Sequence, residues 1–197
     1  ALATWGTGKT MCTLLAGLVN LQRQHYRRVM YMRPLTTMGG DIGFLPGKER
    51  EKLGPWIDSA MDNLQEIFNM FNVPYSETQP IKDQITRLEK EEFLQFKSGT
   101  HMPGRTIHDT FWIIDECHNY SREEIKMLLS RAGKNTKVVL MGDPNQIITE
   151  KNRFLSVSNN GFSHVMERFR GKRQYAHITL PKTDVMRGPV AKLAQEL

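Results

Sequence analysis

Near its start the chain carries glycine, lysine and threonine in the order Gly6-Thr7-Gly8-Lys9-Thr10. The backbone N–H groups of a glycine turn, followed by a helix N-terminus, form a concave array of donors that suits phosphate oxygens. The Lys9 ammonium would reach the β- and γ-phosphates of a nucleotide, and the Thr10 hydroxyl would ligate the accompanying Mg²⁺. Residues 3–10 therefore predict a phosphate-binding loop. The residues predicted to bind the nucleotide are Gly6, Thr7, Gly8, Lys9, Thr10 and Met11.

One position of this loop departs from the full phosphate-loop pattern. Ala3 stands where the pattern has glycine, and alanine allows the backbone fewer conformations. The alternative interpretation is that the string arises by chance in a turn that opens a helix. An acidic segment farther along the chain favours the phosphate loop.

That acidic segment is Asp115-Glu116, which follows the apolar run FWII at residues 111–114. If the run is a buried strand, the carboxylates lie at its carboxyl end, where ligands bind in open α/β sheets. We expect Asp115 to hold Mg²⁺, and Glu116 to orient and deprotonate the water that attacks the γ-phosphate. The alternative is a pair of acids in the first turn of the next helix, where negative charge is favoured.

A further apolar run, residues 138–141, ends in Gly142-Asp143-Pro144-Asn145-Gln146. The Gln146 amide is suited to contact the γ-phosphate and its water, so that it would sense whether a triphosphate is bound. The alternative is a plain Asp-Pro turn, for which this composition is also suited. We predict the sensor, and we therefore count Gln146 with Lys9 and Glu116 as catalytic.

The elements that must position these residues follow an α/β pattern. Apolar residues recur at helical spacing in residues 10–21 and 56–71. Short apolar runs between such segments predict buried parallel strands. The predicted strands are residues 29–32, 111–114 and 138–141, with weaker candidates at 93–96 and 175–180, and residues 187–197 are predicted to form a closing helix.

Length and composition limit the class of protein. The chain has 197 residues and a net charge of +6, which suits one domain and favours polyanionic partners. Its two cysteines, Cys12 and Cys117, have no metal-ligand spacing, and no apolar run approaches the roughly 20 residues of a membrane span. We expect a cytoplasmic protein. Because Ala1 is not an initiator Met and only Ala1 and Leu2 could end a strand before the loop, we expect residues 1–197 to be one P-loop ATPase domain that is a fragment, with its first strand largely missing.

Together with residues 33–35 (RPL) and 41–56 (DIGFLPGKEREKLGPW), these motifs resemble the PhoH-like family of P-loop ATPases over nearly the whole chain. Further matches are Gly104-Arg105-Thr106, Asn119, residues 137–146 and Asn160-Gly161-Phe162. The resemblance implies an α/β fold of the RecA-like P-loop NTPase type, related to superfamily 1 helicases. Its mostly parallel sheet would be flanked by helices, with a Gly/Pro-rich and helical insertion after the second strand.

The resemblance also implies ATP hydrolysis with Mg²⁺, RNA unwinding in some members, and homo-oligomeric rings such as a hexamer. Arg187 falls where the family carries a late arginine, which would act as a finger on a neighbour's transition state. Arg33 and Arg105 lie in motif-bearing loops, so we expect them to contact nucleic acid.

Three positions depart from the family pattern: Pro103 replaces an arginine, His118 a glutamine and Gly188 a serine. Asp115-Glu116-Cys117-His118 also spells the DExH box of superfamily 2 helicases. The segment at 142–146 argues against that assignment, because superfamily 2 proteins would carry a Ser-Ala-Thr type motif there.

The function predicted is an ATPase whose nucleotide cycle drives movement on RNA or another single-stranded nucleic acid. A nucleotide-controlled assembly module with slow hydrolysis is the alternative. A small-molecule kinase is weaker, since Glu116 suits water activation and no acceptor-binding lid is evident.

Overall fold

The computed structural model describes residues 7–34, 54–70, 81–98, 104, 106–147 and 154–180, without the side chains of 54–56. The closing helix predicted for residues 187–197 lies outside this part of the chain, as does the predicted sheet end at residues 1 and 2. Within it, helices lie between most successive strands along the chain, which is an α/β pattern.

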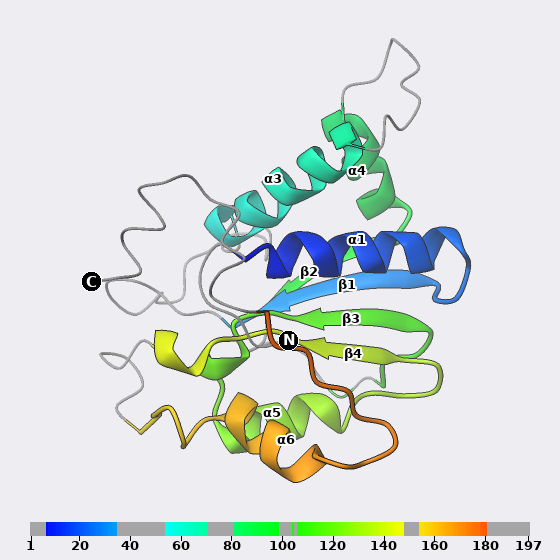
Figure 1. Ribbon diagram of the computed structural model, residues 1–197. Coiled ribbons are helices and arrows are strands. Elements are labelled where there is room, and N and C mark those ends of the chain that lie inside the picture. The colour runs from blue at the N-terminus through cyan, green and yellow to red at the C-terminus, as the bar shows by residue number, and fades with distance from the viewer. Residues whose placement is uncertain are drawn as a thin grey trace, which may run out of the picture.

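The centre of the molecule is a parallel sheet of four strands in the order β2-β1-β3-β4 (Figure 1). The strands are β1 (Arg28–Arg33), β2 (Leu94–Ser98), β3 (Thr110–Ile114) and β4 (Lys137–Leu140). In the register of the central pair, Tyr31 lies beside Ile113 and Met32 beside Ile114. Because all strands run in the same direction, their carboxyl ends meet at one edge of the sheet.

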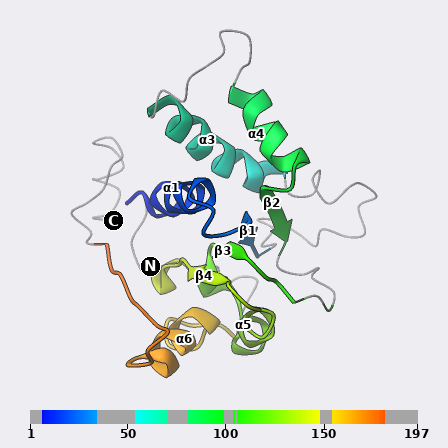
Figure 2. The ribbon, with the colours of Figure 1, turned by 90° about the vertical axis from the view of Figure 1, so that its right-hand side faces the viewer.

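Helices cover both faces of this sheet (Figure 2). On one face lie α1 (Lys9–Gln22), α3 (Gly54–Met70) and α4 (Ile81–Lys90), and on the other lie α5 (Arg122–Leu129) and α6 (Gly161–Phe169). Two short 3-10 helices, η1 (Cys117–Asn119) and η2 (Pro144–Gln146), follow β3 and β4.

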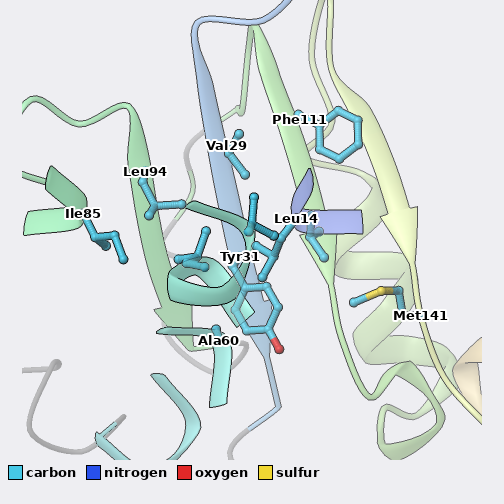
Figure 3. Packing of buried hydrophobic residues seen from close by; sticks show 11 residues of the cluster. Leu14, Val29, Tyr31, Ala60, Ile85, Leu94, Phe111 and Met141 are labelled. Atoms are coloured by element: carbon cyan, nitrogen blue, oxygen red, sulfur yellow. The ribbon is translucent and has the colours of Figure 1, made fainter. Parts of the chain in front are cut away.

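Alternation along the strands divides the core into two clusters, because successive side chains point to opposite faces of a sheet. Tyr31 and Ile113 pack with Leu14 of α1 and Leu64 of α3 in one cluster, part of which is shown in Figure 3. The other cluster joins Trp112 and its strand neighbours to α5 and α6. The sheet is therefore buried on both faces, as the continuous apolar runs predicted.

Most of the predicted elements are confirmed. The strands expected at 29–32, 93–96, 111–114 and 138–141 are β1 to β4, and both amphipathic helices form as α1 and α3. The segment predicted as an insertion is part of the core, since α3 packs on α1 and β2 pairs with β1. Helix α4, which lies between them, was not predicted.

The strand predicted for residues 175–180 is wrong. This stretch forms no strand, and Ile178 is 61% exposed, so no apolar surface holds it against the sheet. Its alternate side chains contact one another instead: the Tyr175 hydroxyl lies 3.2 Å from His177 Nδ1, and His177 Nε2 lies 2.9 Å from Thr179 Oγ1. Alternation in the sequence reflects this local polar row.

Gly161, the first residue of α6, is required by the close approach of α5. A Cβ atom at this position would lie 2.6 Å from the Ser121 carbonyl oxygen and 2.9 Å from the Ile125 Cβ. We expect Gly161→Ala to lower the free energy of unfolding by about 1–3 kcal/mol, measured by urea denaturation, because backbone and a buried side chain must both move. The exposed Glu167→Ala in the same helix is the control, and equal stability of the two variants would contradict this packing.

Candidate active site

The predicted phosphate loop leads into α1 through Gly8. Gly8 adopts φ 75° and ψ 13°, a left-handed conformation that glycine takes at little cost, and its carbonyl accepts the first helical hydrogen bond from the Cys12 N–H at 2.9 Å. Among the described residues no side chain caps this helix N-terminus. The amide groups and the dipole of the first turn thus favour an anion at this end of α1.

Asp115 follows β3 at the carboxyl edge of the sheet and is 5% exposed. Its backbone N–H continues the pairing with β1 by donating to the Met32 carbonyl at 2.8 Å. The Tyr31 hydroxyl donates to one carboxylate oxygen at 2.5 Å, and the Glu116 N–H donates to the other at 2.9 Å. Burial, followed by the Asp115 charge, raises the pKa of Tyr31 well above its ordinary value, so Tyr31 remains a neutral donor that fixes Asp115.

Glu116 has a left-handed backbone, with φ 51° and ψ 39°, that costs a non-glycine residue on the order of 1 kcal/mol or more. The turn is held by the Cys117 N–H, which donates to the Met141 carbonyl at 2.8 Å. Arg33 Nη2 donates to Glu116 Oε1 at 2.9 Å, and His118 Nε2 lies 3.1 Å from Glu116 Oε2. Both carboxylate oxygens of the predicted base are therefore held in place.

The charge of Lys9, at the start of α1, acts on the Glu116 carboxylate. Burial raises the pKa of Glu116, and Asp115 and Asp143 raise it further, while the Arg33 and Lys9 cations lower it. An electrostatic effect of this kind requires proximity. Lys9 thus lies near Glu116, although the two residues are far apart in the sequence.

The predicted sensor forms a tight turn at the end of β4. The Asp143 side chain caps η2 by accepting from the Asn145 N–H at 3.1 Å, and Gln146 Nε2 donates to Asp143 Oδ2 at 2.5 Å. The turn therefore has the Asp-Pro geometry of the alternative interpretation, and it also brings Gln146 to the edge where Asp115 and Glu116 lie.

His118 links this turn to Glu116, and the sequence had indicated it only as a replacement for the family's glutamine. The ring is 1% exposed, and its Nδ1 accepts a hydrogen bond from the Asp143 N–H at 3.0 Å. Burial is the main cause that lowers the pKa of His118 to about 4, against opposing effects of Asp143 and Asp115. The imidazole is therefore neutral near pH 7.

This pKa predicts a pH-dependent stability. The unfolded chain takes up a proton as the pH falls through 6.5, whereas folded His118 resists protonation until about pH 4. The contribution of neutral His118 to the free energy of unfolding is therefore complete above pH 6.5 and is lost progressively as the pH falls toward 4. Between about pH 7 and pH 4.5 we expect the free energy of unfolding to fall by roughly 2 kcal/mol more in the parent than in His118→Gln, as measured by urea denaturation. Parallel pH profiles would contradict the assignment.

Other predicted site residues are placed only in part. Thr7 is buried. The Met11 side chain is partly buried and packs against the core. Arg33, predicted to contact nucleic acid, pairs with Glu116. Gly6, Arg105 and Arg187 lie outside the described residues.

The oxygen donors predicted for Mg²⁺ fit that ion. Mg²⁺ prefers oxygen ligands and usually keeps several waters, with one or two protein groups and phosphate oxygens completing its shell. The Thr10 hydroxyl and the Asp115 carboxylate are donors of this class, at the start of α1 and the end of β3. Within the described ranges no cluster of three or more His, Cys, Asp or Glu side chains could hold a metal by itself.

A groove of about 540 Å³ lies on the other side of the molecule, between α5 and α6. Ile125 and Val165 contribute to its apolar lining, and Lys126, Arg168 and Phe169 also line it. None of the residues predicted to bind nucleotide borders this groove, so it is separate from the candidate site.

Comparison with known protein families shows which family the chain belongs to. The family model described as PhoH-like protein matches residues 1–197. The chain belongs to the PhoH-like family. Its members are in general ATP-binding proteins, which agrees with the parallel α/β fold and with a helix N-terminus placed beside an acidic pair.

Curated relatives include longer proteins. Protein PhoH2 of Bacillus subtilis (strain 168) is 39% identical over 193 residues, which cover 98% of this chain and 41% of that protein. Protein PhoH2 of Mycolicibacterium smegmatis is 34% identical over 98% of this chain and 40% of its own length. The PhoH-like protein of Bacillus subtilis is 29% identical over 96% of this chain and 54% of its own. Among the described helices of our chain, none is both long and apolar enough to cross a bilayer.

Proposed function

We propose that this chain binds ATP with Mg²⁺ and hydrolyses it. The proposal is supported by the position of Glu116 after β3, at the carboxyl edge of a parallel sheet, together with the Lys9 charge at the start of α1, which lowers the pKa of Glu116. Lys9 begins a helix whose N-terminus favours phosphate, and Glu116 carries a partly buried carboxylate whose two oxygens contact Arg33 and His118. In the proposed arrangement the Lys9 cation and the Glu116 base both face the γ-phosphate, as hydrolysis of a triphosphate requires.

In this mechanism the first turn of α1 and the Lys9 ammonium bind the β- and γ-phosphates. Thr10 and Asp115 would hold Mg²⁺, which neutralises phosphate charge when bound. Glu116 takes a proton from a water as that water's oxygen bonds to the γ-phosphorus and the bond to the bridging oxygen of ADP breaks. Gln146 orients the water, and Arg187 of a neighbouring subunit in a ring would stabilise the developing charge.

We further propose that nucleic-acid binding regulates this site through Arg33. Arg33 ends β1 and its guanidinium donates to Glu116 Oε1 at 2.9 Å. A phosphate of RNA or single-stranded DNA that attracts this guanidinium would weaken its hold on the base. A second contact with the phosphate backbone of the nucleic acid is offered by the basic side chains at and after the end of α6, which are Arg168, Arg170, Lys172 and Arg173. Unwinding, a hexameric ring and a cytoplasmic location belong to this proposal.

The test is the rate of phosphate release from ATP with and without a single-stranded RNA. A motor predicts Mg²⁺-dependent hydrolysis that RNA stimulates by about 10-fold or more and that high salt reverses. A slow rate that is indifferent to RNA and to single-stranded DNA would favour the assembly module and remove the nucleic-acid part of the proposal. Transfer of phosphate to a metabolite in place of water would favour a kinase.

A further inference from the structure

His118 uses both ring nitrogens on two different segments of the site. Its Nδ1 faces the Asp143 N–H at 3.0 Å, and its Nε2 faces Glu116 Oε2 at 3.1 Å. The Asn119 side-chain amide lies 3.1 Å from the same Nε2. The ring thus spans from the segment after β3 to the segment after β4.

The direction of these hydrogen bonds can be assigned. A backbone N–H can only donate, so Nδ1 must accept from Asp143. In a neutral imidazole the proton then lies on Nε2, which donates to the Glu116 carboxylate. This tautomer satisfies the contacts with Asp143 and Glu116, whereas Asn119 Nδ2, itself a donor, makes no hydrogen bond to the protonated Nε2.

The ring has little room to move independently of the turn. A Cβ atom on Gly142 would lie 3.1 Å from His118 Nδ1 and 3.3 Å from the Phe162 ring, which shows how closely the end of β4 approaches the imidazole. His118 is 1% exposed and Asp143 is 4% exposed. A shift of the Asp143 backbone must therefore move the imidazole with it.

The same turn carries Gln146, whose amide donates to Asp143 Oδ2 at 2.5 Å. A continuous series of hydrogen bonds then runs from Gln146 through Asp143 and His118 to Glu116. Arg33 holds the second carboxylate oxygen, so only the His118 contact connects Glu116 Oε2 with the turn in the described part of the chain.

We propose that His118 is a positioning residue that couples the γ-phosphate-sensing turn, Asp143 to Gln146, to the orientation of the base Glu116. The proposal rests on the proposed ATPase function. When Gln146 follows the γ-phosphate, the turn shifts, the imidazole shifts with it, and the carboxylate is aligned on the water. His118 does not touch the nucleotide.

Two substitutions separate this role from a structural one. His118→Gln keeps one acceptor and one donor on a flexible side chain, whereas His118→Leu removes both while filling similar space. We expect His118→Leu to lower kcat about 10- to 100-fold with KM for ATP within about twofold, and His118→Gln to recover kcat to within about fivefold of the parent. If His118→Leu does not fold, His118→Asn, which is too short to span both contacts, takes its place.

A double-mutant cycle with Gln146→Ala tests the coupling itself. If the residues act in one series, the kcat loss of the double variant will be much smaller than the product of the single losses. Multiplicative losses, or a parent-like kcat in His118→Leu, would overturn the proposal. A parent protein that does not hydrolyse ATP would instead refute the underlying function, so the two failures are distinguishable.

Discussion

We expect Glu116→Gln to produce a protein that binds ATP and fails to hydrolyse it. Glutamine has nearly the shape of glutamate and can still accept from Arg33, so the turn at residue 116 should be retained. It cannot accept a proton from water, and loss of a general base lowers kcat by about 10²- to 10⁴-fold. The measurements are kcat from phosphate release and the ATP dissociation constant from calorimetry, which should stay within about threefold of the parent.

The control for this experiment is Glu123→Gln in α5, a substitution of an exposed glutamate outside the site. It makes the same loss of one negative charge and should leave kcat unchanged. Equal turnover by the Glu116→Gln protein and the parent would show that another group takes the proton.

The second large effect is expected for Lys9→Ala, which should lose affinity for ATP. Lys9 begins α1 and its charge acts on Glu116, so the ammonium lies where phosphate negative charge would collect. A charge-assisted hydrogen bond to a phosphate contributes about 1.5–3 kcal/mol, so we expect the dissociation constant to rise roughly 10- to 100-fold. Calorimetric titration with ATP measures it, and adenosine without phosphates should bind the two proteins alike.

Lys126→Ala is the matched control, because Lys126 is an exposed lysine of α5 beside the groove. Its loss should leave ATP affinity as it is. If instead Lys126→Ala weakens ATP binding and Lys9→Ala does not, the nucleotide binds in the groove between α5 and α6.

The local pattern predicted most elements, and the exceptions have physical causes. A continuous apolar run predicts a buried strand. Apolar residues at every turn, as in α3, predict a helix with one buried face. Helix α4 does carry apolar residues at helical spacing, Ile81, Ile85 and Leu88, with Asp83 in its first turn and Arg87 and Lys90 in its last, so its pattern was open to prediction although its many charges obscure it. Residues 175–180 alternate like a strand but form no strand, only a single β-bridge at Thr179.

The residues of the candidate site also fall into two groups, those that the sequence indicated and those that only the fold reveals. Lys9, Asp115 and Glu116 belong to short motifs whose chemistry depends on spacing, so the sequence could indicate them. Tyr31 and His118 act through contacts between segments that are far apart in the sequence, and the order β2-β1-β3-β4, which brings these segments together, cannot be deduced from sequence order. The Arg33 contact with Glu116 has the same origin, because β1 lies directly beside β3.

The site assignment is tested most directly by a crystal structure of the Glu116→Gln protein with ATP and Mg²⁺. The proposal predicts the γ-phosphate between the Lys9 ammonium and the residue 116 amide, with Mg²⁺ on Thr10 and Asp115 and with Gln146 turned toward the γ-phosphate. A triphosphate bound away from Lys9, or a metal that contacts neither Thr10 nor Asp115, would contradict it.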